Sequence, residues 1–465
     1  MDSAPQLGGP AVEGSTLSGL RVLILSYYFP PLASAGGHRM GALSRHLAEQ
    51  GADVRVVTVK HGLDVTDPAL LEQLPASVNV RRVPSLEGAR LRHMLRDRFK
   101  HSGDERDETE QDGSATSSSF LQRILIALAW TISAARVLQP WGLRRWIYAR
   151  NAQRALREEI ERERPDVLLA SLGPMSQTWA ALNAAKGTGV PVVFDFRDLW
   201  TTAPEYYTSI RAYPFSRPML WFDQRLERKA LRGASFFVVN HDQMRQTLER
   251  LEPRAVGNSV TIPNGYEEDD FAALPEAGER AGGARIVRSV GTTYIYTVGP
   301  LLEACGELDA ETAEVLKVEL IGPYYDQNLL SAGAIAQRVV EVRAPMPHAD
   351  ALAAMNDADV LLFLLRDMPG IEDMIPARLY EYLRLGKPLL ALAPEGAAKE
   401  LVLANGGTVI HPKDVDGLVA ELRRIAGGEL PGGADPASEQ VQRFSRRSQA
   451  QELGTELRKV AERSR

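Results

Sequence analysis

Short continuous hydrophobic runs alternate with helical periods along most of the chain. The run "LRVLILSYYFPP" predicts a strand that is buried on both faces, as in a parallel sheet. In the segment that follows, Met40, Leu43 and Leu47 recur at helical spacing, and "DVRVVTV" then returns to a strand. This part of the chain therefore predicts a strand–helix–strand unit with parallel strands.

The same rhythm continues through both halves of the chain. In the first half it recurs in "REEIERERPDVLLASLG" and in "WAALNAAKGTGVPVVFDFRD". A fresh series of strands is then predicted at "RIVRSVGTTY", "LKVELIGP", "VVEVRAP", "DVLLFLL", "PLLALA" and "GTVIH". Short strands that alternate with helices predict an α/β protein with two doubly wound, Rossmann-like parallel sheets.

Breaks in this pattern divide the chain into domains. One segment is acidic, rich in serine and without hydrophobic periodicity, which predicts a disordered surface insertion at about 101–119. The segment "PNGYEEDDFAALPEAGERAGGAR", from Pro263 to Arg285, has the Gly, Pro and charge content of a linker. The predicted divisions are a flexible tail at 1–19, a first domain at 20–265, a linker at 266–285, a second domain at 286–445, and a C-terminal helix at 446–465 that crosses back to the first domain or stays solvated.

Composition is that of a globular protein. Hydrophobic residues make up 44% of the chain, charged residues 25%, and the net charge is −6, so nothing favours general binding to nucleic acid. The first twenty residues lack the basic start and the apolar core of a signal peptide. A cytoplasmic location is therefore expected.

One segment has the pattern of a helix that lies at a membrane surface. Its apolar run from Ile124 to Ala135 is shorter than the roughly 18 residues that are needed to span a bilayer. Downstream, Trp141, Trp146 and Tyr148 lie among arginines, which is typical of an interfacial helix. A core helix of the first domain has a similar pattern. The first alternative predicts that residues 121–150 make peripheral contact with the inner face of a membrane.

Two glycines directly before a predicted helix are candidates for phosphate binding. Gly36 and Gly37 would let backbone amides approach a ligand at the positive end of the helix, and His38 and Arg39 would add donors. A purely structural glycine turn is the alternative, and the G-x-G-x-x-G motif of dinucleotide-binding folds is absent.

Polar residues close the strand "VVFDF" at the edge where open α/β sheets bind ligands. Asp195, Arg197 and Asp198 are candidates there for a ligand-binding role, with a structural ion pair as the equal alternative. The eight histidines are scattered, and neither HExxH nor CxxC occurs, so no metal site is predicted.

The strongest candidate site surrounds the helix in "DMIPARLYEYLRLGKP". Pro376 suits the first turn of a helix, and Gly386 stops it, which places Asp373 in the preceding loop and Glu381 over a turn into the helix. A ligand along this helix start would bind amides through phosphates and carboxylates through hydroxyls. The residues therefore suggest a sugar-nucleotide site, with a capping acid and a surface acid as the alternative.

Several motifs in order resemble the GT-B glycosyltransferases of family 4, also described as the glycosyl transferase group 1 type. They are "YYFPPLASAGGHRMGALSRHLAEQGADVRVVT", "VVFDFRDLW", "VTIPNGYEEDDF", "VELIGP" and "IPARLYEYLRLGKPLLAL". The resemblance implies two Rossmann-like domains that face a cleft, an NDP-sugar as donor substrate without a further cofactor, and transfer with retention and without a metal. The C-terminal domain would bind the donor and the N-terminal domain a glycan, lipid-linked or small-molecule acceptor.

The family's residues transfer to this chain position by position. The family's paired acids fall on Asp373 and Glu381, with Glu372 as an alternative for the first; the second would bind the ribose. The resemblance places the other donor contacts at Gly36, Gly37, Gly291, Thr292, Met374, Ile375 and Pro376, and the acceptor side at His38, Asp195, Arg197 and Asp198.

The chain departs from the family at the segment "VGTTYIYTVGPLLEAC". Family members commonly carry an Arg and a Lys after the matching strand to neutralise the leaving diphosphate, whereas no basic residue lies between Arg288 and Lys317. Arg378, with the Met374 and Ile375 amides, is expected to substitute, and Arg39 is a second candidate. The rival interpretations are a catalytically silent GT-B protein that binds a nucleotide sugar or acts as a scaffold, and a nucleotide-sugar epimerase.

Overall fold

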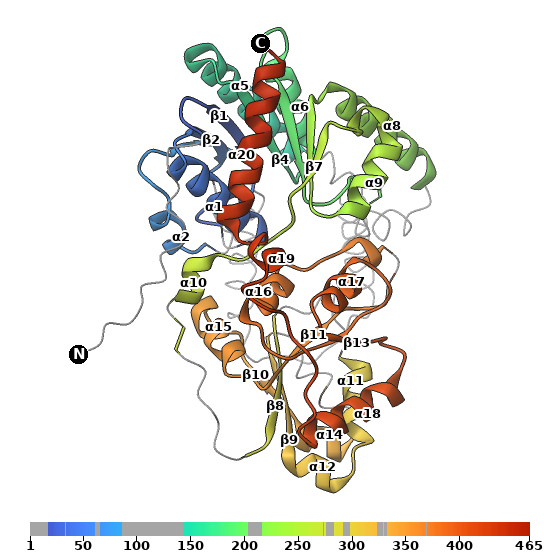
Figure 1. Ribbon diagram of the computed structural model, residues 1–465. Helices are drawn as coiled ribbons and strands as arrows, with labels where there is room; N and C mark the ends of the chain where they lie inside the picture. The colour runs from blue at the N-terminus through green and yellow to red at the C-terminus, as the bar shows by residue number, and fades with distance from the viewer. Residues whose placement is uncertain are drawn as a thin grey trace, which may run out of the picture.

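The computed structural model describes most of the chain, which forms two halves joined by two connections (Figure 1). The described residues are 17–32, 34–60, 66–85, 143–202, 216–272, 274–275, 283–291, 298–322, 329, 333–368 and 370–465, without the side chains of 143–146, 216–219, 222 and 373. The tail at 1–16, the insertion predicted at 101–119, the run from Ile124 to Ala135, Trp141, Thr292 and the side chain of Trp146 lie outside what is described.

The N-terminal half is built on a parallel sheet of seven strands. Their order is β3-β2-β1-β4-β5-β6-β7. In register, Val22 lies opposite Val54 on one side and Val167 on the other. The strands are β1 (Arg21–Ser26), β2 (Asp53–Val59), β3 (Asn79–Val83), β4 (Val167–Leu172), β5 (Val192–Phe196), β6 (Phe236–Val239) and β7 (Ser259–Thr261).

Helices cover both faces of this sheet. The buried residues of β1 alternate between two cores: Leu23 and Leu25 pack with α5 and α6, whereas Val22 and Ile24 pack with α1 and α20. The helices of this half are α1 (Ala35–Glu49), α2 (Ala69–Glu72), α5 (Leu143–Glu163), α6 (Ser176–Ala185), α8 (Ser216–Gly233), α9 (Asp242–Leu251) and the 3-10 turn η2 (Pro253–Ala255). Hydrophobic strands with helices on both faces form the doubly wound arrangement that the sequence predicts.

The end of the segment expected at a membrane surface belongs to this core. Tyr148, in α5, is fully buried, and its hydroxyl donates to Gln177 Oε1 at 3.2 Å. At Tyr148, the structure therefore agrees with the alternative prediction of a core helix.

The C-terminal half repeats this arrangement with a parallel sheet of six strands, in the order β10-β9-β8-β11-β12-β13. The strands are β8 (Arg285–Val290), β9 (Leu316–Ile321), β10 (Val340–Arg343), β11 (Val360–Leu364), β12 (Leu389–Leu392) and β13 (Thr408–Ile410). The helices are α11 (Gly299–Gly306), α12 (Ala310–Val315), α14 (Ala334–Val339), α15 (His348–Asn356), α16 (Arg378–Leu385), α17 (Ala397–Ala404), α18 (Val415–Ala426), α19 (Glu439–Gln442) and the 3-10 turn η3 (Ile371–Asp373).

Two elements connect the halves. The short helix α10 (Glu268–Ala272) follows β7, and α20 (Arg446–Arg463) leaves the C-terminal half and runs back along the N-terminal sheet (Figure 1). The buried face of α20, which includes Leu453 and Leu457, joins the same core as α1. The chain therefore crosses between the halves twice.

The fold class predicted from the hydrophobic pattern is confirmed. Both sheets are parallel throughout, and both carry helices on their two faces. The predicted strand "RIVRSVGTTY" ends at Val290, and the helix expected to include Pro376 begins at Arg378.

Candidate functional site

Each sheet has one point where the strand order reverses. In the N-terminal sheet it lies between β1 and β4, and in the C-terminal sheet it lies between β8 and β11. Ligands of open α/β sheets bind at such points, beyond the carboxyl ends of the strands. Gly36 and Gly37 follow β1, Gly291 follows β8, and η3 and α16 follow β11. The predicted donor residues thus gather at the two reversal points.

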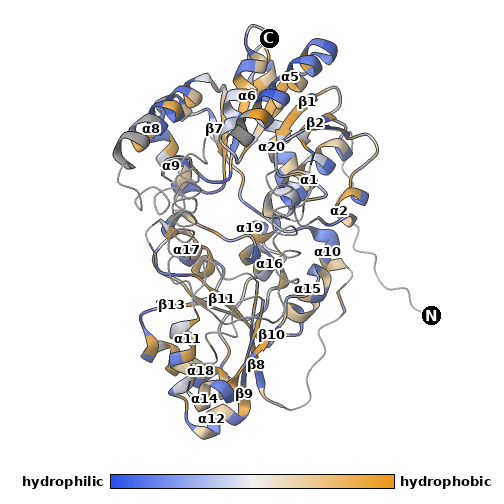
Figure 2. Cartoon of the chain, turned by 180° about the vertical axis from the view of Figure 1, so that it is seen from behind, coloured by the Kyte–Doolittle hydropathy of each residue, from blue (hydrophilic) through white to orange (hydrophobic). Residues whose placement is uncertain are grey.

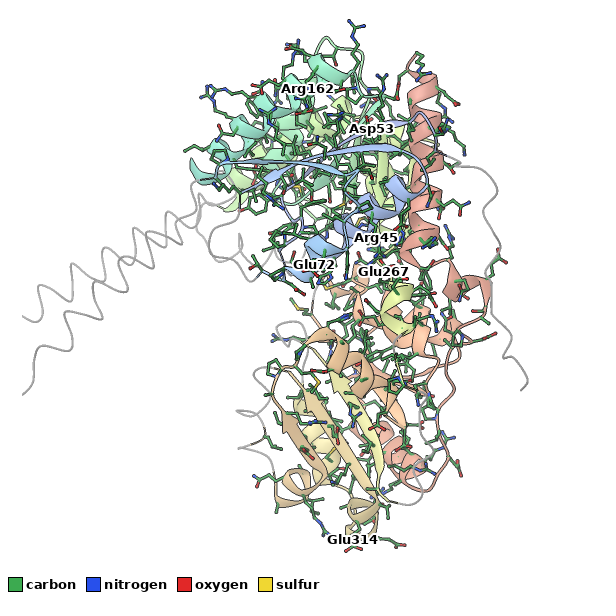
Figure 3. The ribbon with its side chains drawn as sticks, turned by 90° about the vertical axis from the view of Figure 1, so that its left-hand side faces the viewer. Arg45, Asp53, Glu72, Arg162, Glu267 and Glu314 are labelled. Carbon is green, nitrogen blue, oxygen red and sulfur yellow. The ribbon has the colours of Figure 1, made fainter. Side chains whose placement is uncertain are left out.

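The carboxyl ends of the two sheets face one another. His38, in the first turn of α1, and His348, at the start of α15, belong to different halves, yet their ring centroids are 6.2 Å apart. Nearby, Arg45 of α1 contacts Glu267, with Arg45 Nη2 2.7 Å from Glu267 Oε1. Figure 3 shows Arg45 and Glu267 where the halves meet. A ligand between the halves would therefore contact residues of both.

Helix α16 is fixed against the end of β8 by its buried face. The Val290 N–H donates to Tyr382 Oη at 3.1 Å, and Leu379 and Leu383 are fully buried. Gly386 ends the helix in the left-handed conformation, with φ of 66°, which glycine adopts without strain. This packing sets the direction in which Arg378 and Glu381 project.

Arg378 lies directly over Gly291, the residue that follows β8. A Cβ added at Gly291 would stand 1.3 Å from Arg378 Nη2 and 1.7 Å from Cζ, so only glycine leaves room for this guanidinium. Gly291 also has φ of 137°, which an L side chain rarely adopts. The structure thus brings together two residues that the sequence proposed separately, and it places a cation at the reversal point of the donor sheet.

Arg288, the basic residue nearest to Gly291 in the sequence, forms an ion pair inside the domain. Arg288 is buried within β8, where its Nη2 lies 2.6 Å from Glu319 Oε2. Its guanidinium also donates to the Ala354 carbonyl. Arg288 is thus neutralised inside the domain.

Glu381 belongs to a cluster of titratable groups from both halves. Its Oε1 lies 3.1 Å from His348 Nε2, while His348 Nδ1 lies 3.8 Å from Asp270 Oδ2. The hydrogen bond to Glu381 raises the pKa of His348, against the effect of burial. Burial raises the pKa of Asp270, although His348 and Arg446 act in the opposite direction.

His38 contributes no charge to this cluster at neutral pH. Burial, together with the positive charges of Arg446 and His348, lowers the pKa of His38 to about 4. His38 and Gly37 line a shallow pocket with Arg446 at the start of α20. A neutral imidazole still carries one donor and one acceptor nitrogen. His38 therefore fits contact with a hydroxyl group better than charge stabilisation of a phosphate.

Replacing His348 by glutamine is expected to alter how stability depends on pH. Because the folded-state pKa of His348 is raised above 6.5, its stabilising contribution is fully present below pH 6.5 and is lost as pH rises through the raised value. His348 is 47% exposed, so the contribution should be within about 0.2–1 kcal/mol. Melting curves between about pH 5.5 and 8.5 should show the wild-type advantage over His348→Gln shrinking as pH rises. An advantage that stays constant with pH would contradict this account.

The predicted site residues in the loop before α16 differ in their exposure and in their backbone contacts. Glu372 is exposed, and its backbone packs on Gly396, where a Cβ would lie 2.4 Å from the Glu372 carbonyl oxygen. Asp373 ends η3, and its side chain lies outside the described part of the structure. The Met374 N–H donates to the Ile371 carbonyl at 2.9 Å, which does not fit the expected use of this amide for a diphosphate.

Two further members of this loop are partly buried. Ile375 and Pro376 separate η3 from α16, and the Pro376 carbonyl accepts a bond from the Leu379 N–H at 3.0 Å. Ile375 and Pro376 therefore pack at the junction between the η3 loop and α16.

The two glycines at the start of α1 are required by close packing. A Cβ on Gly36 would lie 2.0 Å from Arg197 Nη1, and one on Gly37 would lie 2.0 Å from the Leu32 carbonyl oxygen. The Gly37 N–H is capped by Ser34 Oγ at 3.1 Å. The structure thus supports the structural alternative for Gly37. It also places Arg197, from the end of β5, over the positive end of α1.

Arg39 and Asp195 form a buried ion pair. Arg39 Nη2 lies 3.1 Å from Asp195 Oδ1, and the guanidinium also donates to the Ile262 and Pro263 carbonyls. Asp195 additionally accepts from Ser171 Oγ at 3.0 Å. The expectation that Arg39 contacts a diphosphate does not fit this pairing, because its charge is neutralised inside the N-terminal core. Asp198, by contrast, is exposed at the end of β5.

His348, Asp270 and Arg446 were missed by the sequence analysis. His348 lies at the end of the short loop after a predicted strand, in "RAPMPHAD", which is the signal that could have found it. Asp270 and Arg446 lie in the two connections between the halves, and only the folded arrangement brings them to Glu381.

Two classes of feature are not found among the residues with described coordinates. No group of three or more His, Cys, Asp or Glu side chains there is arranged to hold a metal ion. In the same part of the chain, no helix has the length and hydrophobicity to cross a membrane.

Comparisons with known proteins agree with the architecture. Residues 115–265 match the family model described as a glycosyl transferase 4-like domain. None of the curated proteins matches the chain in sequence.

Solved structures are similar to the chain over nearly its whole length. The apo form of the lipopolysaccharide outer core galactosyltransferase WaaB has a TM-score of 0.56 and 11% identity, covering 95% of this chain and 99% of that chain. HepE of Anabaena in complex with UDP-glucose has a TM-score of 0.51 and 13% identity, covering 96% and 98%. Sucrose-phosphate synthase from Thermosynechococcus elongatus has a TM-score of 0.55 and 15% identity, covering 95% and 99%. The chain therefore has the fold of the GT-B glycosyltransferases.

Proposed function

We propose that this chain, which has the GT-B fold and a glycosyl transferase 4-like domain at residues 115–265, transfers a sugar from a nucleotide-sugar donor to an acceptor. The observation that carries the proposal is the position of Arg378 over Gly291, at the reversal point of the C-terminal sheet. Glu381, on the same helix, supplies a carboxylate nearby. A diphosphate and a ribose need these two kinds of group side by side.

Transfer breaks the bond between the anomeric carbon and the diphosphate oxygen and forms a new bond to an acceptor hydroxyl oxygen, whose proton is released with the nucleoside diphosphate. Negative charge develops on the departing diphosphate, and a fixed cation at that place stabilises the transition state more than the ground state. Arg378 takes this role in the proposal, in place of the Arg and Lys that the segment after β8 lacks. Transfer would retain the anomeric configuration and use this side chain instead of a metal ion.

The N-terminal half would bind the acceptor. Arg197 lies over the start of α1, and the neutral His38 belongs to the first turn of that helix. The carboxyl edge of the N-terminal sheet therefore offers both hydrogen-bond donors and a hydrogen-bond acceptor. WaaB, which is similar in fold, is described as a lipopolysaccharide outer core galactosyltransferase. By analogy, we propose a glycan or lipid-linked sugar as acceptor, reached from the cytoplasmic side, with the part of residues 121–150 that precedes α5 in peripheral membrane contact.

Release of nucleoside diphosphate tests this proposal. Purified protein is incubated with UDP-, GDP-, ADP- and dTDP-sugars, with and without candidate acceptors and with EDTA. Release that requires an acceptor and survives EDTA is the expected result. Conversion of the donor sugar without any acceptor would favour the epimerase, and nucleotide binding without turnover for every acceptor would favour the silent binder.

A further inference from the structure

Helix α8 carries a stripe of basic residues on its outer face. Arg225, Arg228, Lys229 and Arg232 are all exposed, and Trp221 begins the stripe with 59% of its surface exposed. At about 100° per residue, these five positions fall within an arc of about 100°. Figures 1 and 2 show α8 on the flank of the N-terminal half, beside α9. One face of this helix is thus cationic and ends in an indole.

The acidic residues of the same helix point the other way. Asp223 and Glu227 are buried, with 1% and 3% of their surface exposed. Glu227 accepts hydrogen bonds from the Trp200 N–H at 3.1 Å and the Thr201 N–H at 3.2 Å. Because its carboxylates face inward, the outer face of α8 has no neutralising charge of its own. Among the described residues, no ion pair within 4.0 Å involves Arg225, Arg228 or Lys229, while Arg232 is close enough to the buried Glu252 to contribute to its lowered pKa.

The inward bonds also fix where this face lies relative to the candidate site. Trp200 and Thr201 follow β5 directly, after Arg197 and Asp198. Glu227 therefore ties α8 to the carboxyl end of β5, the edge to which we assign the acceptor. A surface that docks on α8 would lie beside this edge.

We propose that the stripe Trp221–Arg225–Arg228–Lys229–Arg232 docks the protein on an anionic phospholipid surface. Charge complementarity carries this assignment: the chain as a whole has a net charge of −6, so attraction to anions is confined to local faces such as this one. The exposed indole favours a lipid surface over a nucleic acid, since tryptophan partitions to the bilayer interface. Arg225 lies 5.8 Å from the Trp221 ring centroid and keeps cation and indole together.

The proposal goes beyond sugar transfer, and its test needs no donor. Full-length protein is floated with phosphatidylcholine vesicles that contain or lack phosphatidylglycerol. Binding is expected only with the anionic lipid and should weaken as salt increases. Each basic residue near an anionic surface contributes about a 5-fold factor, so Arg225→Ala/Arg228→Ala/Lys229→Ala should lower the partition coefficient about 100-fold. Trp221→Ala should also lower it.

A charge-matched control separates this face from a general charge effect. Lys317→Ala/Arg338→Ala/Lys413→Ala removes three exposed basic residues from the C-terminal half and should leave vesicle binding unchanged. Equal losses for both triple variants, unchanged binding of the α8 triple, or no binding of the wild type would each overturn the proposal. So would single-stranded RNA that binds more tightly than vesicles and competes with them. Melting temperatures confirm that the variants are folded.

Discussion

Replacing Arg378 by alanine is expected to lower kcat for sugar transfer by about 100- to 1,000-fold, the usual effect of losing one preorganised donor to a developing charge. Arg39, the other candidate for this role, and Arg288, the last basic residue before the segment that follows β8, both lie inside the protein core. Arg288 is buried and bound to Glu319, and Arg39 is buried and bound to Asp195. The segment between Arg288 and Lys317 contains no other basic residue. Arg378→Lys should recover part of the rate, because it keeps the charge but loses the forked geometry.

The measurement is donor turnover at saturating substrate, with nucleotide affinity determined in parallel. A larger loss in kcat than in affinity would show that Arg378 acts mainly in the transition state. Arg338→Ala, which removes an exposed arginine from α14, is the matched control and should leave both quantities unchanged. If Arg378→Ala turned over at the wild-type rate, the leaving diphosphate would have to be stabilised by other groups.

Replacing Glu381 by alanine is expected to weaken nucleotide binding by about 10- to 150-fold. The estimate follows from the about 1.5–3 kcal/mol that a hydrogen bond to a charged group contributes. Glu381 is held in place by His348, which donates or shares a proton at 3.1 Å, and by the packing of α16 on β8. In the proposed complex its free carboxylate oxygen accepts the ribose hydroxyls.

Calorimetry with the nucleoside diphosphate measures this effect directly. Glu314→Ala is the control, since Glu314 is an exposed acid on α12 at the far end of the C-terminal half (Figure 3). Glu381→Gln should bind better than Glu381→Ala because it keeps an acceptor oxygen. Unchanged affinity in Glu381→Ala would remove the ribose role from this residue and, with it, the assigned position of the donor.

The sequence predicted the sheets because their signal is local. Continuous apolar runs such as those of β1 and β11 occur only where both faces of a strand are covered, and the structure buries them in this way. Helix α16 was predicted for the same reason, from the period of Leu379 and Leu383 and the stop at Gly386. The reversal points belong to the doubly wound arrangement that the parallel repeat predicts.

Contacts between distant segments could not be predicted in this way. From the sequence, Arg39 was predicted to bind a ligand phosphate. Its partner Asp195 lies 156 residues away in the chain and contacts it only after folding. Asp270 and Arg446 reach the Glu381 cluster because α10 and α20 connect the two halves there, an arrangement that no hydrophobic period encodes. Conversely, the role suggested for Arg378 gained support from a contact with Gly291 that sequence spacing does not show.

The central claim is that the C-terminal half binds a nucleotide sugar at Arg378 and Glu381. Thermal unfolding in the presence of UDP, GDP, ADP and dTDP and their sugars tests it most directly, because a ligand that binds only the folded state stabilises it, by about 2.7 kcal/mol at 100 times its Kd. We expect one base to raise the melting temperature of the wild type, and Glu381→Ala to lose most of this shift at the same concentration. No shift with any nucleotide, or equal shifts in wild type and Glu381→Ala, would contradict the account.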